Sequence, residues 1–277
     1  MYCYHEVFER DALEGGTVQV NGFKIEVKPV NDPDGADSVS CRATVTSPKG
    51  KVVYQQSDWG MEIDPITGKH INGDGEPDAV LVDYSGGAHC CWTYDVVSLG
   101  KNPGLIGKFY NRDTASFSDL RGDGQIEISI RDGSFDFGFG LDHASSVFPL
   151  LIVQLRGTNF QDVGSECWPI FKKAIQQERR KLDNADLQEF LHPRPNQPDN
   201  SDHEMTRSTL LLIALDYLYG GKYPEAKNVL AQFWPQHSQE KTWKEMLDGY
   251  CSGLRFQMGL QSVPPCENKK TDAYSSF

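Results

Sequence analysis

The first part of the chain alternates apolar and polar residues, which is the pattern of a β-strand with one buried face. Residues 17–30 alternate in this way around Asn21-Gly22, a dipeptide that favours a two-residue hairpin turn. The alternation continues over residues 38–46 and 51–56, which a Pro-Lys-Gly turn separates. This region is therefore predicted to form antiparallel β structure.

Further apolar segments also predict strands. They comprise residues 79–84, 92–99, 126–131 and 148–156. The whole β region is too short for a closed propeller of several blades, because each blade uses about four strands. We expect an open sheet, a small sandwich or two to three propeller-like blades.

The pattern becomes helical after the β region. Residues 168–182 are amphipathic, and the proline-rich residues 193–198 interrupt the helical pattern. Ser201 and Asp202 are suited to cap a helix that reaches Tyr219.

These patterns predict an α+β protein with two domains. The first is a β domain over residues 1–165, and the second, over residues 166–277, consists of helical hairpins. A length of 277 residues is enough for two domains, and a hydrophobic content of 38% is enough for a core.

One helical segment, residues 210–233, resembles a tetratricopeptide unit. Its matching small and aromatic positions are Ala214, Tyr217, Gly221, Tyr223 and Ala226. The resemblance implies a helical pair that packs on neighbouring helices or on the β domain, because one unit cannot bury its own apolar face. An ordinary helical hairpin that turns at Gly220-Gly221 explains the same residues, and the later positions of the repeat do not match.

Two short loops carry the strongest chemical signal in the chain. Residues 70–78 and 119–127 each approximate the pattern D-x-N-x-D-G-x-x-D/E, in which alternate side chains offer oxygen atoms and a glycine allows a sharp turn. Calcium is a hard ion that takes roughly six to eight oxygen ligands, so a tightly curled loop is suited to bind it. An apolar segment follows each loop, and each turn should therefore lead into a strand.

The first loop lacks its first carboxylate, because His70 stands at that position. The predicted calcium ligands are the side chains of Asn72, Asp74 and Asp78 and the main-chain carbonyl of Glu76. The loss of one carboxylate weakens a site whose affinity depends on the charge of its ligands.

The second loop has Arg121 at its third position. The predicted ligands are the side chains of Asp119, Asp123 and Glu127 and the carbonyl of Gln125. Arg121 could replace the metal by pairing with Asp119 or Asp123, so we expect calcium in the first loop before the second. For both loops, the alternative is a turn whose side chains bond their own backbone.

The first loop and the strand after it resemble the FG-GAP and VCBS repeats of integrin-type propellers and of many bacterial surface and periplasmic proteins. The resemblance rests on the Asn-Gly-Asp-Gly-Glu-Pro-Asp string of residues 72–78, on the Ala-Val-Leu-Val that follows, and on the recurrence of the loop. It covers roughly residues 55–160. It implies an extracytoplasmic β module that calcium stabilises.

The compartment follows from this resemblance alone. Residues 1–6 have neither a basic start nor an apolar stretch, so we expect a mature periplasmic or secreted protein whose signal peptide has been removed. A cytoplasmic protein is the alternative. Seven cysteines leave at least one thiol outside disulfides, and one disulfide is expected among Cys167, Cys251 and Cys266 in an oxidising compartment.

A second unusual string, His89-Cys90-Cys91, follows two glycines. Its functional interpretations are a redox pair of thiols, a metal site, or a cysteine nucleophile with His89 as its base. Adjacent side chains on a strand point to opposite faces, which disfavours metal binding by both cysteines. We expect a tight turn that leads into a strand with one buried cysteine.

Phe135, Phe137 and Phe139 alternate with small or acidic residues. A strand would place all three rings on one face, and packing in the core is the expected use. The alternative is an exposed aromatic surface for a ligand or partner, because the glycines of residues 133–140 loosen this segment.

The formal net charge of −12 disfavours nucleic acid as a partner, because phosphate binding uses clustered lysines and arginines. An acidic surface suits cations and a basic protein partner, and a glycan is the other partner class that we consider. The longest apolar run, residues 148–153, is too short to span a membrane.

Motifs of the common hydrolases, metalloproteases and nucleotide-binding enzymes are missing from the sequence. We therefore expect a non-catalytic binding or interaction protein with a structural calcium ion. One alternative is a hydrolase of cell-wall polysaccharide that uses Asp83 or His89. Another is an inhibitor or immunity protein against a cationic wall-degrading enzyme, since some bacterial inhibitors of lysozyme-type enzymes have similar degenerate loops.

Overall fold

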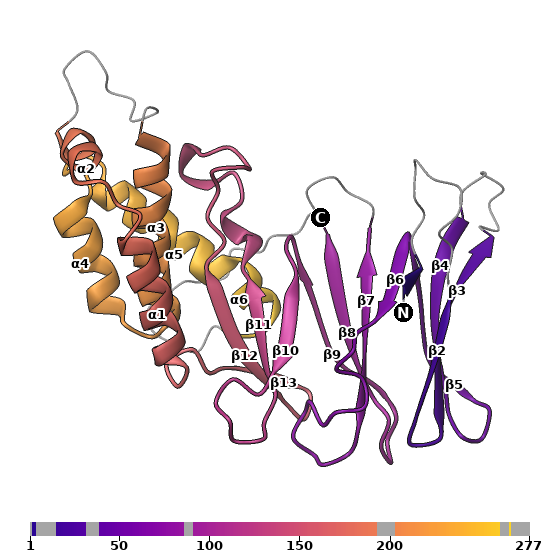
Figure 1. The fold of residues 1–277 in the computed structure, drawn as a ribbon. Coiled ribbons are helices and arrows are strands. Elements are labelled where there is room, and N and C mark those ends of the chain that lie inside the picture. The colour runs from indigo at the N-terminus through magenta and orange to yellow at the C-terminus, as the bar shows by residue number, and fades with distance from the viewer. Residues whose placement is uncertain are drawn as a thin grey trace. The chain divides into compact units, whose positions relative to one another are not determined.

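The computed structural model describes residues 2–3, 15–31, 39–85, 91–192, 203–260 and 266 (Figure 1). The chain forms two compact units. The first unit consists of Met1–Arg131 and Ile152–Gln161, and the second of Asp132–Leu151 and Asp162–Phe277. The units therefore interleave along the chain.

The β structure consists of three antiparallel sheets, and in each of them strands that follow one another in sequence are neighbours. The first sheet contains β2 (Gly16–Val20), β3 (Phe23–Asn31), β4 (Val39–Thr46) and β5 (Val52–Asp58). The second contains β1 (Tyr2–Cys3), β6 (Gly60–Ile63), β7 (Asp78–Tyr84), β8 (Trp92–Ser98) and β9 (Gly104–Asn111). The third contains β10 (Ala115–Ser118), β11 (Glu127–Arg131), β12 (Leu150–Arg156) and β13 (Asn159–Asp162).

Apolar side chains join these sheets within the first unit. Ile25 and Val45 of the first sheet and Leu81 of the second are fully buried in one cluster. On the opposite side of the second sheet, the Phe109 ring packs edge-on against Phe160, with ring centroids 5.8 Å apart. The first two sheets thus share an apolar core, and β7 in the second sheet is buried on both faces.

The predicted α+β class is confirmed, and the β structure consists of three sheets rather than a closed propeller. The hairpin between β2 and β3 turns at Asn21 and Gly22, whose φ angles of 51° and 78° suit a tight turn. Between residues 70 and 130, the described part of the chain contains no helix. The short or polar strands β6, β9, β10 and β13 were not predicted.

The second unit contains the helices. They are α1 (Trp168–Arg179), α2 (Asn184–Leu191), α3 (Glu204–Tyr219), α4 (Tyr223–Phe233), α5 (Gln239–Ser252) and α6 (Leu254–Gln257). The predicted helices that start at residue 168 and end at Tyr219 are confirmed. The proposed cap residues Ser201 and Asp202 and the proline-rich segment lie outside the described residues.

Helices α3 and α4 form a hairpin that turns at Gly220-Gly221. A Cβ atom at Gly220 would lie 2.9 Å from the Trp168 ring, and Gly221 has a φ of +74°. The turn therefore needs both glycines. The hairpin agrees with either explanation of this segment, and the tetratricopeptide resemblance stays a prediction.

The three phenylalanines do not lie on a strand, and the expected packing in the core holds for Phe135 alone. This segment forms two short 3₁₀ turns, η1 (Gly133–Phe135) and η2 (Gly138–Gly140). Phe135 is buried, whereas Phe137 is 55% exposed. Phe137 and Phe139 have φ angles of 59° and 57°, so the backbone is left-handed at these residues and the rings do not share one face.

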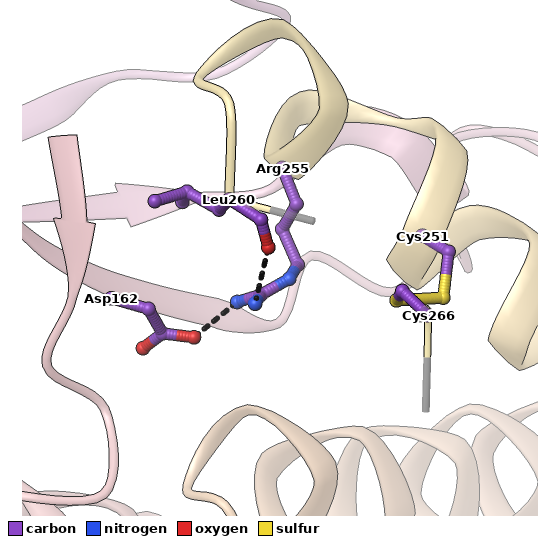
Figure 2. Close-up of a disulfide and its surroundings, with 5 residues drawn as sticks. All are labelled: Asp162, Cys251, Arg255, Leu260 and Cys266. Atoms are coloured by element: carbon purple, nitrogen blue, oxygen red, sulfur yellow. Dashed lines mark hydrogen bonds and ion pairs between the residues drawn. A yellow bond between two sulfur atoms is a disulfide. The ribbon is translucent and has the colours of Figure 1, made fainter. Parts of the chain in front are cut away.

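A buried arginine lies at the C-terminal end of the described chain in the second unit. Arg255 is 1% exposed, pairs with Asp162 and donates to the Leu260 carbonyl at 3.1 Å (Figure 2). The Cys251–Cys266 disulfide lies in the same region. The predicted disulfide among the last three cysteines is therefore confirmed, and Cys167 is a buried thiol.

Candidate calcium loops

The two predicted calcium loops occupy equivalent places in successive sheets. The first loop connects β6 to β7, and the second connects β10 to β11. In each sheet these are the first two strands of a run of four that are consecutive in sequence. The last residue of each motif, Asp78 or Glu127, is also the first residue of the strand that follows. The sequence motif thus marks a structural repeat.

The backbones of the two loops are alike in detail. The Ile71 N–H donates to Asp78 Oδ2 at 2.8 Å, and the Leu120 N–H donates to Glu127 Oε2 at 2.7 Å. Both motif glycines of each loop have φ angles between 71° and 82°. Each loop therefore holds one oxygen of its last carboxylate by the same backbone contact.

In the first loop, the side chains of Asn72 and Asp74 bond each other and the backbone. Asn72 Nδ2 donates to Asp74 Oδ2 at 3.0 Å, and the Asp74 N–H donates to Asn72 Oδ1 at 3.1 Å. The Glu76 N–H donates to Asp74 Oδ1 at 2.8 Å. These oxygen atoms thus gather within one turn, as both the calcium prediction and the simple-turn alternative require.

The environment of Asp78 distinguishes a calcium site from a simple turn. Its side chain is fully buried, and its Oδ1 atom accepts no hydrogen bond from any described residue. Burial raises the pKa of Asp78 to about 6, against the lowering effect of the Ile71 and Asn72 N–H groups. A buried carboxylate oxygen without a donor is costly, whereas a cation in the loop would satisfy it.

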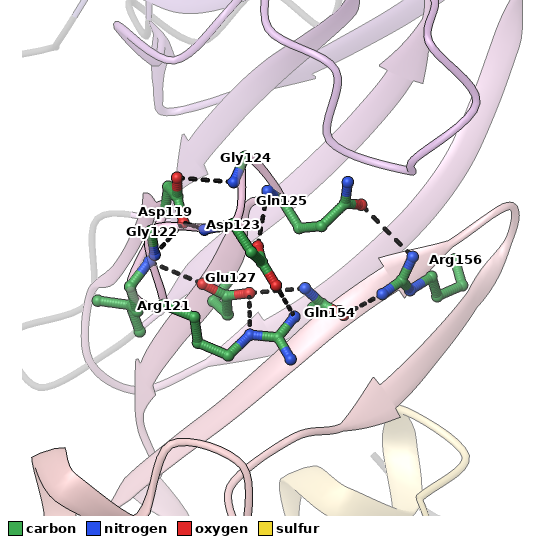
Figure 3. A network of polar contacts seen from close by, with 10 residues as sticks. Asp119, Arg121, Gly122, Asp123, Gly124, Gln125, Glu127, Gln154 and Arg156 are labelled. Atoms are coloured by element: carbon green, nitrogen blue, oxygen red, sulfur yellow. Dashed lines mark hydrogen bonds and ion pairs between the residues drawn. The ribbon is translucent and has the colours of Figure 1, made fainter.

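In the second loop, Arg121 supplies that cation. Its Nε lies 3.1 Å from Glu127 Oε1, and its Nη2 lies 3.2 Å from Asp123 Oδ2 (Figure 3). Arg121 was expected to pair with Asp119 or Asp123, and the pairing with Asp123 is confirmed. The contact with Glu127 was missed, because the sequence does not show that the arginine reaches back to the end of the loop.

Two residues from β12 complete this network. Gln154 Nε2 donates to Glu127 Oε1 at 2.6 Å, and Arg156 Nη2 donates to Gln154 Oε1 at 2.8 Å. Arg156 Nη1 also donates to Gln125 Oε1 at 3.4 Å. Gln154 is 2% exposed, and a glutamine within an apolar strand is the one sequence signal that could have marked it.

Asp119, the first residue of the second motif, bonds only backbone groups among the contacts described. Its Oδ1 accepts from the N–H groups of Gly122 and Asp123 at 2.7 and 3.1 Å, and its Oδ2 accepts from Gly124 at 2.9 Å. The Gly124 N–H makes the largest contribution to lowering the pKa of this carboxyl. Asp119 therefore acts as the predicted turn-forming side chain.

The two loops differ in their suitability for a metal. Among the described residues, no group of three or more His, Cys, Asp or Glu side chains is arranged to hold a metal ion. The first loop has only Asp74 and Asp78 as central carboxylates, with the amide oxygen of Asn72 beside them. Its donor set fits a calcium ion in part, because Asp78 Oδ1 has no partner among the residues that the structure describes.

The cysteine string is only partly described. Residues 86–90, with His89 and Cys90, lie outside the described residues. Cys91 precedes β8 and is 5% exposed, as expected for the one buried cysteine. Cys91 is disulfide-bonded, however, so it is not a buried free thiol.

The carboxylate of the hydrolase alternative is also buried. Asp83 on β7 is 2% exposed, and Asp95 on the neighbouring strand β8 is fully buried. A substrate cannot reach either group without a movement of the surrounding strands. Sequence reasoning missed Asp95, although an aspartate inside an apolar strand is an unusual feature.

Comparisons with protein-family models, with curated proteins and with solved structures give no match for this chain.

Proposed function

We propose that this chain is a non-catalytic extracytoplasmic binding protein whose first loop holds a structural calcium ion. Asn72, Asp74, Asp78 and the carbonyl of Glu76 would hold the ion, which would join the two ends of the loop. The equivalence of the two loops supports the resemblance to FG-GAP repeats, in which each sheet would correspond to a propeller-like blade.

The observation that carries this proposal is the buried Oδ1 atom of Asp78, which accepts no hydrogen bond from a described residue. In the second loop, the equivalent oxygen of Glu127 accepts hydrogen bonds from Arg121 and Gln154. The first loop has the same backbone fold as the second but lacks the arginine, so its buried Asp78 carboxylate needs another positive charge beside it.

The disulfides support an extracytoplasmic location. Cys41, Cys91, Cys251 and Cys266 are all disulfide-bonded. Disulfides persist in the periplasm and outside cells and are rare in the cytosol. None of the described helices is both long and apolar enough to cross a membrane.

The net charge of −12 favours a basic protein as the partner. This observation also favours the second candidate function, an inhibitor of a cationic wall-degrading enzyme. Binding to a basic lysozyme-type enzyme, measured by calorimetry at low and high salt, tests this candidate. Salt-sensitive binding together with a loss of wall-fragment turnover supports it, and the absence of binding at low salt rejects it.

A thermal melt with calcium or with a chelator tests the metal proposal. Calcium at a hundredfold excess over its Kd should stabilise the folded protein by roughly 2.7 kcal/mol, since the ion binds only the folded loop. Asp74→Ala should remove most of this gain. Asp123→Ala, the matched change in the second loop, should leave it intact.

Asp78→Asn provides a second variant. Without calcium this variant should have the same free energy of unfolding as wild type or a higher one, because an uncharged amide of nearly the same shape replaces a buried carboxylate. With calcium it should show no gain. A wild-type melting curve that is the same in calcium and in chelator would reduce both motifs to turns.

A further inference from the structure

A second group of buried charges lies inside the first unit, away from the loops. Asp83 stands opposite Thr93 in the pairing of β7 with β8, and Asp95 stands opposite Leu81. The two carboxylates therefore lie on the same face of the sheet, on neighbouring strands and two positions apart in register. Both are buried, with exposed fractions of 2% and 0%.

Asp95 has partners for its charge. The Tyr54 hydroxyl, from the facing strand β5, donates to Asp95 Oδ2 at 2.6 Å. The ammonium group of Lys108 on β9 lies 3.2 Å from Asp95 Oδ1. Tyr54 has its pKa raised by burial and by Asp95, so it remains a neutral donor.

Asp83 has no such partner. The Thr93 hydroxyl bonds one side of the carboxyl group, and Asp83 Oδ2 accepts no hydrogen bond from any described residue. Asp58 on β5 and Asp95 both act on Asp83 with a like charge, and Lys108 is the cation that opposes them. Lys108 already pairs with Asp95, so the ionised form of Asp83 has no counter-ion of its own among the described residues.

We propose that Asp83 is a proton-binding switch of the first unit. With a proton, the Asp83 carboxyl is neutral, keeps its hydrogen bond with Thr93 and no longer repels Asp58 and Asp95. Without the proton, the carboxylate repels both aspartates and loosens the packing of β5 on β7 and β9. The unit is then tightest in mildly acidic surroundings and looser above neutral pH.

The direction follows from the cost of burial. Burial, with the like charges of Asp58 and Asp95, raises the pKa of Asp83 to about 6, against the lowering effects of the Thr93 hydrogen bond and of Lys108. A carboxyl whose folded pKa lies above its unfolded value stabilises the fold below the unfolded value. This stabilisation is lost as the pH rises through the folded value. A difference of about two pKa units changes the folding equilibrium constant by roughly a hundredfold.

Urea unfolding between pH 4.5 and 8 tests the proposal with wild type, Asp83→Asn and the control Glu189→Gln. Glu189 is exposed and lies in the second unit. The ratio of the wild-type to the Asp83→Asn equilibrium constant should fall by roughly thirtyfold from pH 4.5 to pH 8, which is the part of the hundredfold change that lies above pH 4.5. The ratio of wild type to Glu189→Gln should stay constant. Parallel pH profiles for wild type and Asp83→Asn would overturn the proposal.

Hydrogen exchange gives a second measurement. After correction for the intrinsic rates at each pH, the amides of β5 should lose protection above pH 6 in wild type but not in Asp83→Asn. If Asp83→Asn does not fold, the carboxyl titration of wild type by ¹³C NMR decides instead. The absence of a buried aspartate that titrates near pH 6 in saturating calcium would contradict the proposal. Both measurements are made with calcium and with a chelator, so their outcome does not depend on the calcium site.

Discussion

The loops before β7 and β11 share a backbone but differ in the charge that they place against their last carboxylate. In the loop before β11, Glu127 is buried against the guanidinium of Arg121 and the amide of Gln154. In the loop before β7, Asp78 is just as deeply buried, and one of its oxygens has no donor among the described residues. One fold of the loop is thus found with an arginine against its last carboxylate in one copy and without such a side chain in the other.

The third position of the motif makes this difference. Arg121 occupies it in the second loop, and Asn72 occupies it in the first. A long cationic side chain reaches two carboxylates at once and stays in place without any ion. The shorter side chain of Asn72 bonds Asp74, and Asp78 Oδ1 at the end of the loop is left without a donor among the described residues.

The largest effect is expected from Arg121→Ala. The change leaves Glu127, which is fully buried, with its charge opposed only by neutral donors. Breaking such a pair costs roughly 3 kcal/mol of unfolding free energy, measured by chemical denaturation. Asn72→Ala, the matched change in the first loop, should cost only about 1 kcal/mol. Equal losses would mean that the two loops do not differ in the way proposed.

A gain of function is expected from Arg121→Asn. The variant restores the D-x-N-x-D-G pattern in the second loop, with Asp119, Asp123 and Glu127 as carboxylates. In an Asp78→Asn background, which silences the first loop, calcium at a hundredfold excess over its Kd should raise stability by roughly 2.7 kcal/mol. Melting curves with and without calcium measure this gain. No response in the double variant would show that the second loop cannot accept an ion.

The smallest effect is expected from Asp119→Asn. The three backbone N–H groups hold the pKa of Asp119 below its usual value, with the Gly124 N–H first. Its contribution to stability is therefore present above the unfolded pKa and is lost as the pH falls through the lower folded pKa. The melting temperature of wild type should fall between pH 5 and pH 3, and that of Asp119→Asn should fall by only slightly less. A large change would assign Asp119 a role beyond the turn.

Much of the fold could be predicted from local patterns. The alternation of residues 17–30 and the Asn21-Gly22 turn predict the first hairpin, because side-chain period and turn geometry are local properties. The strand β9 was missed, since Gly104, Gly107 and Lys108 break its apolar pattern. Antiparallel pairing with the preceding strand β8, rather than an apolar pattern of its own, fixes the position of β9.

In the candidate site, too, local sequence patterns predict some residues and long-range contacts decide others. The motif spacing identifies Asp78 and Glu127 as the last residues of their loops, and the identity of Arg121 indicates that it can take the place of a metal. The contact of Gln154 with Glu127 joins residues far apart in sequence, and no local pattern contains it. Packing of all three phenylalanines in the core was wrong, because the left-handed backbone at Phe137 and Phe139 turns the rings away from a common face.

The sequence by itself determined most of the longer strands, the helices that start at residue 168 and end at Tyr219, the two loop motifs and the charge of the chain, since each depends on composition or on residues that are near one another along the backbone. Only the tertiary structure decided which carboxylates are buried and which of them have partners. Asp78, Asp83 and Asp95 read alike in the sequence, but burial and the arrival of Lys108 and Tyr54 from other strands give them different surroundings. The free energy of a buried charge depends on the groups that folding brings to it, and these come from distant parts of the chain.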